Sequence, residues 1–147
     1  MRTIKFRAWD NQLNQWARGK DLDYANILNF PVNDYFIKDG HEVDRWSFSQ
    51  FTGLHDKNGK EIYEGDIVQM HSEFYNVLGN DDNNFDRDYI GEIAIQASRG
   101  TVLKRPKWHC NITDEDGRDN FYKPITAIRS EVIGNIYENP ELLTPQH

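Results

Sequence analysis

The sequence predicts a mainly β fold, either a small bent sheet or an SH3-like barrel with irregular insertions and a short C-terminal helical turn. Many short segments alternate apolar and polar residues, and Gly, Asn and Asp separate them at short intervals, as in small barrels. The chain has 147 residues, of which 37% are hydrophobic, and this is enough to bury one core. We therefore expect a single domain over residues 1–147.

The first element expected is a hairpin. Ile4, Phe6 and Ala8 alternate with other side chains, the two-residue period of a strand with one buried face. The turn-forming residues 10–12 follow, and Trp16 marks a returning strand. The next stretch, residues 19–45, has no such pattern, and we interpret it as a variable insertion.

Within that insertion the sequence indicates two local structures. Residues 21–30 contain apolar positions that suit a short helix, and Pro31 would end it. Further on, Asp39-Gly40 is typical of a turn.

The strongest local signal lies between residues 46 and 70. Residues 46–51 alternate like a strand, and Asn58-Gly59 then favours a tight type I′ hairpin, in which both central residues have positive φ. A short strand over residues 67–70 follows. We interpret five residues of this region as structural turn residues: Gly53, Asn58, Gly59, Gly65 and Asp66.

The second half continues with strands and turns. Residues 72–88 are rich in Asn and Asp and predict a long, variable loop, after which residues 89–97 alternate as a strand. Two further strands are expected at residues 101–105 and 107–112, with Pro106 between them favouring a kink or a sheet edge.

The C-terminal part predicts three more elements. Residues 114–117 have the composition of a turn, and residues 131–137 are typical of a last strand. Asn139, Pro140 and Glu141 then provide an N-cap, an N1 proline and an early acid for one short helical turn.

Three segments of the chain belong together as a pattern: Ile4–Trp9 (IKFRAW), Phe51–Val68 (FTGLHDKNGKEIYEGDIV) and Glu131–Pro140 (EVIGNIYENP). Together they resemble the YopX family of bacteriophage and prophage proteins. The resemblance spans the chain but does not include residues 19–45 or 72–88. It implies a phage-encoded, oligomeric, cytoplasmic protein of mixed β architecture and unestablished biochemical role, and it implies no catalytic residues.

Composition also bears on location. The single cysteine, Cys110, excludes an internal disulfide, and residues 1–5 are charged where a secretory signal would be apolar. No apolar run approaches the roughly 20 residues needed to span a bilayer. We therefore expect a cytoplasmic protein with no membrane partner, and the resemblance implies that this is the cytoplasm of a bacterial host.

Metal and cofactor sites are not expected. His71, His109 and Cys110 are the soft ligands of the second half, but neighbours on a strand point to opposite faces, and paired Cys or His spacings are missing. Asp114, Asp116 and Gly117 resemble the start of a calcium loop, but the required later glutamate is missing. We predict no metal ligand and no cofactor.

Catalysis is not expected either. The sequence has no nucleophile elbow and no glycine loop for phosphate, so we predict a protein that is not an enzyme and has no catalytic residues. An enzyme with acid–base pairs assembled from distant strands stays the alternative.

Binding is the function that the sequence favours, and homo-oligomers and host or phage proteins are the expected partners. Nucleic acid is not favoured as a partner, since the net charge is −7. The alternative is a nucleic-acid-binding module that uses the basic strand 99–109. The structural interpretation of the same residues is an exposed sheet edge that lysine and arginine protect from pairing with other chains. Its candidate contacts are Arg99, Lys104, Arg105, Lys107 and Trp108.

A further alternative is an inhibitor of a host nucleic-acid-binding protein. In this interpretation the acidic stretch within residues 72–88 would occupy the basic site of the host protein. A solvated loop is the structural interpretation of the same residues.

Overall fold

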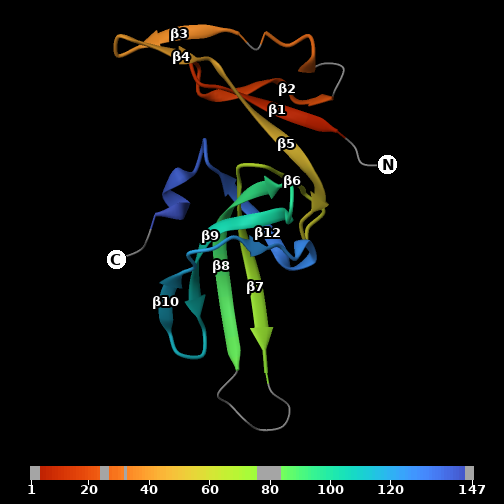
Figure 1. Cartoon of the computed structure of the whole chain (residues 1–147), viewed down its shortest axis with the longest axis vertical. Coiled ribbons are helices and arrows are strands. Elements are labelled where there is room, and N and C mark those ends of the chain that lie inside the picture. Colours follow the sequence, from red (N-terminus) through yellow and green to blue (C-terminus); the bar gives the residue numbers. More distant parts are fainter. Residues whose placement is uncertain (1–3, 24–26, 32, 76–83, 145–147) are drawn as a thin grey trace. The chain divides into compact units, whose positions relative to one another are not determined.

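The computed structural model describes residues 4–23, 27–31, 33–75 and 84–144, and it confirms a mainly β fold of curled antiparallel sheets that include a half-barrel (Figure 1). The strands and 3-10 helices are β1 (Lys5–Asp10), β2 (Gln15–Asp23), β3 (Tyr35–Lys38), β4 (His41–Asp44), β5 (Trp46–His55), β6 (Glu61–Tyr63), β7 (Asp66–Phe74), β8 (Phe85–Gln96), β9 (Gly100–Cys110), β10 (Glu115–Arg118), β11 (Lys123–Pro124), η2 (Ala127–Arg129), β12 (Ser130–Asn135) and η3 (Pro140–Leu143). None of the helices in the described ranges is long and apolar enough to cross a membrane.

The strands form three sheets, with the orders β2-β1-β5-β6, β10-β9-β8-β7-β12 and β3-β4, and β11 pairs with β9. Contacts divide the chain into two compact units, residues 1–53 and 54–147. We describe each unit by itself, and the expectation of a single domain stays a prediction.

The first unit begins with the predicted hairpin. β1 pairs antiparallel with β2 and also with β5, and Ala8 and Trp9 are buried. The buried Asp10 carboxylate ends β1: it accepts hydrogen bonds from the backbone N–H groups of Gln12 and Leu13 and forms a 3.0 Å ion pair with Arg45. This network fixes the turn, because one carboxylate satisfies several donors at once.

The predicted variable insertion contains a second hairpin, β3-β4. Lys38 pairs with His41 across the two-residue turn Asp39-Gly40, whose φ angles are 51° and 79°. Two positive φ angles define a type I′ turn. The helix predicted over residues 21–30 is wrong at its start, because residues 21–23 continue β2, and residues 24–26 lie outside the described residues.

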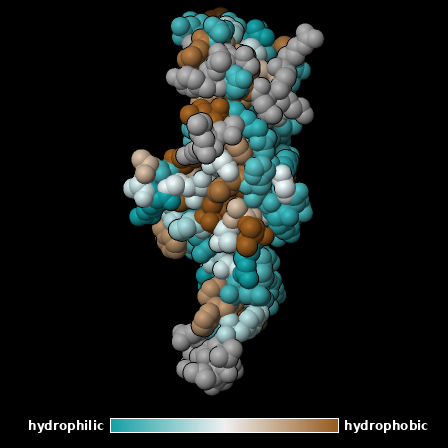
Figure 2. All heavy atoms as spheres, turned by 90° about the vertical axis from the view of Figure 1, so that its right-hand side faces the viewer, coloured by the Kyte–Doolittle hydropathy of each residue, from teal (hydrophilic) through white to brown (hydrophobic). Residues whose placement is uncertain are grey.

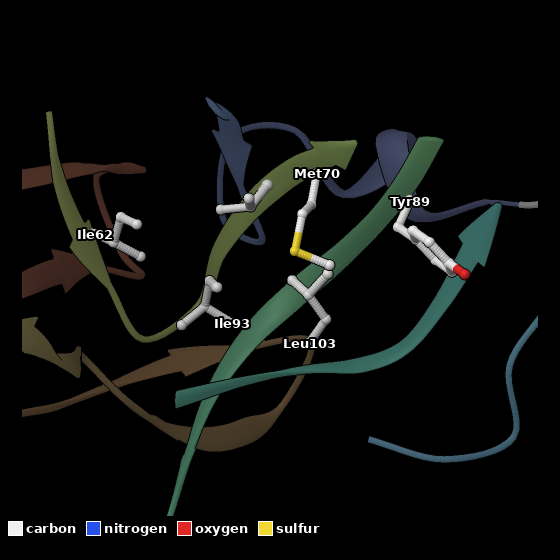
Figure 3. Packing of buried hydrophobic residues seen from close by; sticks show 6 residues of the cluster. Ile62, Met70, Tyr89, Ile93 and Leu103 are labelled. Atoms are coloured by element: carbon white, nitrogen blue, oxygen red, sulfur yellow. The ribbon is translucent and has the colours of Figure 1, made fainter. Parts of the chain in front are cut away.

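The second unit is built on the sheet that contains β7, β8 and β9. Its core is a cluster of buried side chains from β6 to β9, shown in Figure 3: Ile62, Val68, Met70, Tyr89, Ile93 and Leu103. The predicted strand over residues 89–97 is part of β8, and its odd-numbered residues 89, 91 and 93 are buried as the alternation requires. Leu54, Trp108 and Val132 pack against the cluster.

The two strands predicted on either side of Pro106 are one strand, β9, with a bulge. The pairing of β9 with β8 shifts register between Ile90 and Glu92, so that Arg105 and Pro106 both lie opposite Gly91. Arg105 has a φ of 39°, and Pro106 is buried. The predicted kink is therefore present, and it takes the form of a β-bulge.

Three other boundaries differ from the sequence prediction. The loop predicted over residues 72–88 is shorter, because β7 extends to Phe74 and β8 begins at Phe85. The turn expected at residues 114–117 lies earlier, at residues 111–114, and β10 begins at Glu115. The C-terminal turn is η3, and Asn139 precedes it without a side-chain capping hydrogen bond.

The turn at Asn58-Gly59 differs from the predicted type I′ geometry. Gly59 has a φ of 82°, but Asn58 is not among the described residues with positive φ. The Gly59 N–H donates to the Asp56 carbonyl oxygen, and the Asp56 carboxylate accepts from the N–H groups of Asn58 and Lys60. Because the side chain of Asp56 organises the turn from the preceding position, a single positive φ is sufficient.

We expect Gly59→Val to lower the free energy of unfolding by about 1 kcal/mol or more, because valine disfavours positive φ. A Cβ atom at Gly59 would meet nothing within 4 Å, so the backbone alone accounts for the loss. Urea denaturation measures it, with Asn58→Ala as the matched control, which should change stability little. Equal losses in the two variants, or no loss in either, would contradict this turn.

Candidate functional site

The candidate site lies on the face of the second unit's sheet that is opposite the core, which we call the outer face. Register places Gln69, Ile90, Lys107 and Arg118 in one row across β7 to β10, and His71, Asp88, His109 and Asp116 in the next row. Glu73 pairs with Asp86 one step further along β7 and β8. The second row and the Glu73–Asp86 pair thus bring together ionisable side chains from four strands.

A cleft of about 610 Å³ opens on this face. Its lining includes the cationic Lys107 and Arg118 together with the anionic Asp88 and Asp116. The Lys107 ammonium donates to the Thr144 carbonyl oxygen at 3.1 Å, and the Arg118 guanidinium donates to that of Leu143 at 2.8 Å. These bonds attach the C-terminal end of η3 and the residue after it to the outer face.

His71 has acidic groups at both ring nitrogens. Its Nδ1 lies 2.8 Å from an Asp88 oxygen, and its Nε2 lies 3.2 Å from Glu73 and 3.4 Å from Asp86. The hydrogen bonds to Asp88 and Glu73 raise the pKa of His71 above its usual value, because they stabilise the charged ring.

His109 has a similar environment in the same row. Its Nδ1 lies 2.8 Å from Asp116, and its Nε2 lies 3.2 Å from Asp114. The hydrogen bond to Asp116 raises the pKa of His109. The supposed calcium-loop acids, Asp114 and Asp116, therefore contact a histidine.

Asp86 is held by neutral donors. The Tyr75 hydroxyl donates to Asp86 Oδ2 at 2.6 Å, and the Asn111 amide donates to Oδ1 at 2.8 Å. The hydrogen bond from Tyr75 lowers the pKa of Asp86, and the same bond raises the pKa of Tyr75 to about 12. Asp86 is therefore an oriented, ionised carboxylate.

Sequence analysis missed this cluster, although a signal for it exists. His71-x-Glu73 and Asp86-x-Asp88 each have the spacing that puts two side chains on one face of a strand. What the sequence does not contain is the antiparallel register that brings the two pairs together. The region had been interpreted as a loop, so no register was expected there.

Two of the basic residues predicted as a nucleic-acid site, Lys104 and Lys107, lie on the strand face opposite to that of Trp108, although Lys107 and Trp108 both line the cleft. Lys104 pairs with Glu92 and Lys107 with Ile90 on the outer side, whereas Trp108 packs against the core beside Tyr89. The Arg87 guanidinium lies 3.9 Å from the centroid of the Trp108 ring. Stacking of a base on Trp108 beside phosphates on these lysines would need both groups on one side, so this site stays a prediction.

The other basic residues of that segment are exposed. Arg99 precedes β9, Lys104 forms a 3.6 Å ion pair with Glu92, and Arg105 occupies the bulge. β9 is not a bare sheet edge, because β8 lies on one side of it and β10 and β11 lie on the other.

The predicted turn residues have structural contacts. Asp66 is buried, and its carboxylate accepts from the Tyr63 N–H at 2.8 Å. The Gly65 N–H donates to the Ile93 carbonyl oxygen, and Gly53 has a positive φ within β5.

Cys110 and His109 face opposite sides of β9. Cys110 is buried, and hydrogen bonds from Thr113 lower the pKa of its thiol to about 7. The described cluster of possible metal ligands does not include it.

Comparisons with known proteins give a family and a solved structure. A family model described as "YopX protein" matches residues 5–144, nearly the whole chain. The crystal structure of protein EF1440 from Enterococcus faecalis is similar to this chain, with 24% sequence identity and a TM-score of 0.45. The match covers 98% of this chain and 100% of the EF1440 chain. Among curated proteins no match is found.

Proposed function

Because this chain belongs to the YopX family, we propose that it is a phage or prophage accessory protein that acts by binding in the host cytoplasm, as a homo-oligomer and not as an enzyme. One observation supports this most: the second unit exposes an acidic end with apolar side chains and, elsewhere, a basic segment. Complementary surfaces on one chain allow copies to associate.

The acidic end comprises Glu73, Phe74, Tyr75, Asp86 and Ile112, at the ends of β7 and β8 and in the turn after β9. Phe74, Tyr75 and Ile112 are about half exposed, at 49%, 51% and 50%. Such side chains contribute affinity when a partner covers them. On the face that Figure 2 shows, hydrophobic residues interrupt a hydrophilic surface.

The basic segment comprises Arg99, Lys104 and Arg105, all exposed. The ion pair of Lys104 with Glu92 is partly exposed and spans 3.6 Å, so it restrains the ammonium group weakly. The acidic end of one copy therefore suits the basic segment of the next. Such head-to-tail contact closes a ring when the rotation permits.

We expect light scattering at tens of micromolar protein and low salt to give a multiple of the 17.3 kDa chain mass. High salt should shift this mass toward the monomer, because exposed charges are screened. The double variant Lys104→Glu, Arg105→Glu should be monomeric, whereas the control Lys38→Glu, which lies outside both surfaces, should associate like the wild type.

Two outcomes would contradict the proposal. The first is a monomeric mass for the wild type at low salt. The second is an oligomer that is indifferent to both salt and the double variant. A third outcome would favour the nucleic-acid alternative instead. In this outcome the wild type is monomeric and retains an oligonucleotide in a salt-dependent way, and the double variant does not retain it.

A further inference from the structure

Three potential metal ligands from two neighbouring strands converge at the acidic end. β7 contributes His71 and Glu73, and β8 contributes Asp86. One ligand atom from each lies within 4.8 Å of the other two. Among the described residues, no other group of three or more His, Cys, Asp or Glu side chains is found with its ligand atoms this close together.

The spacing of these atoms fits one shared ion. Zn²⁺ bonds to nitrogen and oxygen at about 2.0–2.2 Å, so two ligand atoms on a tetrahedral ion lie roughly 3.4 Å apart. His71 Nε2 lies 3.2 Å from Glu73 Oε2 and 3.4 Å from Asp86 Oδ1. The distances from the ring nitrogen to the two carboxylates therefore suit one ion, and the two carboxylate oxygens lie within 4.8 Å of each other.

The surroundings also orient the ligands as a metal site requires. A histidine that binds a metal through one nitrogen generally donates its other N–H to a carboxylate, and His71 Nδ1 lies 2.8 Å from Asp88. Tyr75 and Asn111, which are not ligands, hold the Asp86 carboxylate through both of its oxygens. These contacts fix the ring and the carboxylate independently of the ion.

His109 provides a comparison on the same face. It also contacts two carboxylates, but Asp116 lies at Nδ1 and Asp114 at Nε2, on opposite edges of the ring. The two carboxylates contact different nitrogens, and these three residues do not form a group of converging ligand atoms as His71, Glu73 and Asp86 do. Carboxylates close to a histidine are therefore not sufficient for a metal site. At His71 two carboxylates lie near the same ring nitrogen, and at His109 they do not.

We propose that His71 Nε2, Glu73 and Asp86 bind one divalent transition-metal ion of the Zn²⁺ type, with Asp88 as the positioning residue behind His71. One imidazole and two carboxylates suit Zn²⁺ better than Mg²⁺ or Ca²⁺, which prefer oxygen ligands alone. Three protein ligands leave a fourth tetrahedral position open to water or to a further ligand. The site goes beyond the proposed function and does not depend on oligomerisation.

Calorimetric titration of the full chain with Zn²⁺ in a non-chelating buffer tests the proposal. We expect saturable binding of one ion per chain that excess Mg²⁺ does not displace. His71→Ala and Asp86→Asn should each abolish that binding, and Asp88→Asn should weaken it by about 10- to 100-fold, as for other groups that orient a ligand. The matched control, His109→Asn, should bind like the wild type.

Spectroscopy gives a second readout that does not rest on affinity. Co²⁺ should bind with visible absorption typical of nitrogen and oxygen ligands, and His71→Ala should lose the absorption while circular dichroism shows an unchanged fold. No saturable Zn²⁺ binding by the folded wild type would overturn the proposal. So would binding that survives His71→Ala and Asp86→Asn or that disappears in His109→Asn.

Discussion

Asp56→Ala is expected to lower the free energy of unfolding by about 3 kcal/mol, the larger of the effects on stability that the structure indicates. Asp56 is buried, at 6% exposure. Its Oδ1 accepts from the N–H groups of Asn58 and Lys60, and its Oδ2 accepts from that of Val132, each at 2.9 Å. The carboxylate thus joins the β5–β6 turn to β12, and its removal leaves three donors without their acceptor.

Urea denaturation at neutral pH measures this loss. Asp56→Asn is the matched comparison. It keeps the size of the side chain but replaces one of the two carboxylate oxygens with an NH₂ group, which cannot accept a hydrogen bond from a backbone N–H. We expect it to be destabilised as well, though by less than Asp56→Ala. Wild-type stability in both variants would show that the three hydrogen bonds contribute nothing.

The same carboxylate predicts a dependence on pH. Burial raises the pKa of Asp56, but the hydrogen bonds from Val132, Lys60 and Asn58 outweigh it, so the pKa is lower in the folded than in the unfolded protein. The stabilisation is therefore present above the unfolded-state pKa and is lost as the pH falls through the folded-state pKa. The stability difference between wild type and Asp56→Ala should narrow correspondingly in acid.

Gly117→Ala is expected to lower the free energy of unfolding by about 1–3 kcal/mol, the usual cost of forcing extra volume into a packed site. A Cβ atom at Gly117 would lie 2.2 Å from the Trp108 ring. The ring cannot easily move away, because it packs against the core cluster and the Arg87 guanidinium covers it.

A double-mutant cycle attributes this cost to the ring. In a Trp108→Ala background, Gly117→Ala should cost much less, because the clash is gone. Chemical denaturation of the four proteins provides the comparison. An equal cost in both backgrounds would show that Gly117 is required by the backbone of β10 and not by Trp108.

The strand pattern was predictable because burial alternates where the sequence alternates. Tyr89 and Ile93 face the core in β8, and the opening hairpin lies where apolar spacing indicated; the last strand, predicted over residues 131–137, is β12, which ends at Asn135 before a turn. These are local signals of period two, and tertiary contacts reinforce them. The mainly β fold follows from such elements without knowledge of the sheet order.

Turn geometry was less predictable because it depends on neighbouring side chains. Asn58-Gly59 has the dipeptide preference for a type I′ turn, yet Asp56 redirects the local hydrogen bonds and Asn58 lacks the positive φ. Asp39-Gly40, a weaker signal, adopts the type I′ geometry. A dipeptide preference is thus overridden where a preceding carboxylate competes for the backbone.

The candidate metal cluster could not be predicted for a different reason. Its residues belong to two strands, and the sequence gives their spacing within each strand but not the pairing of His71 with Asp88. The apparent loop composition of residues 72–88 also concealed the ends of both strands. Pairing is a property of the folded sheet, and one residue of slippage would move every side chain to the other face.

The bulge in β9 determines how this strand can change by insertion or deletion during evolution. Before the bulge the odd-numbered Leu103 faces the core, and after it the even-numbered Trp108 does. Deletion of Arg105 alone would leave Pro106 opposite Gly91 and restore an uninterrupted alternation, with the faces of the distal half unchanged. Trp108 would still face the core and His109 the outer side, whereas loss of one residue from the regular part of β9 would exchange the faces of the residues beyond it.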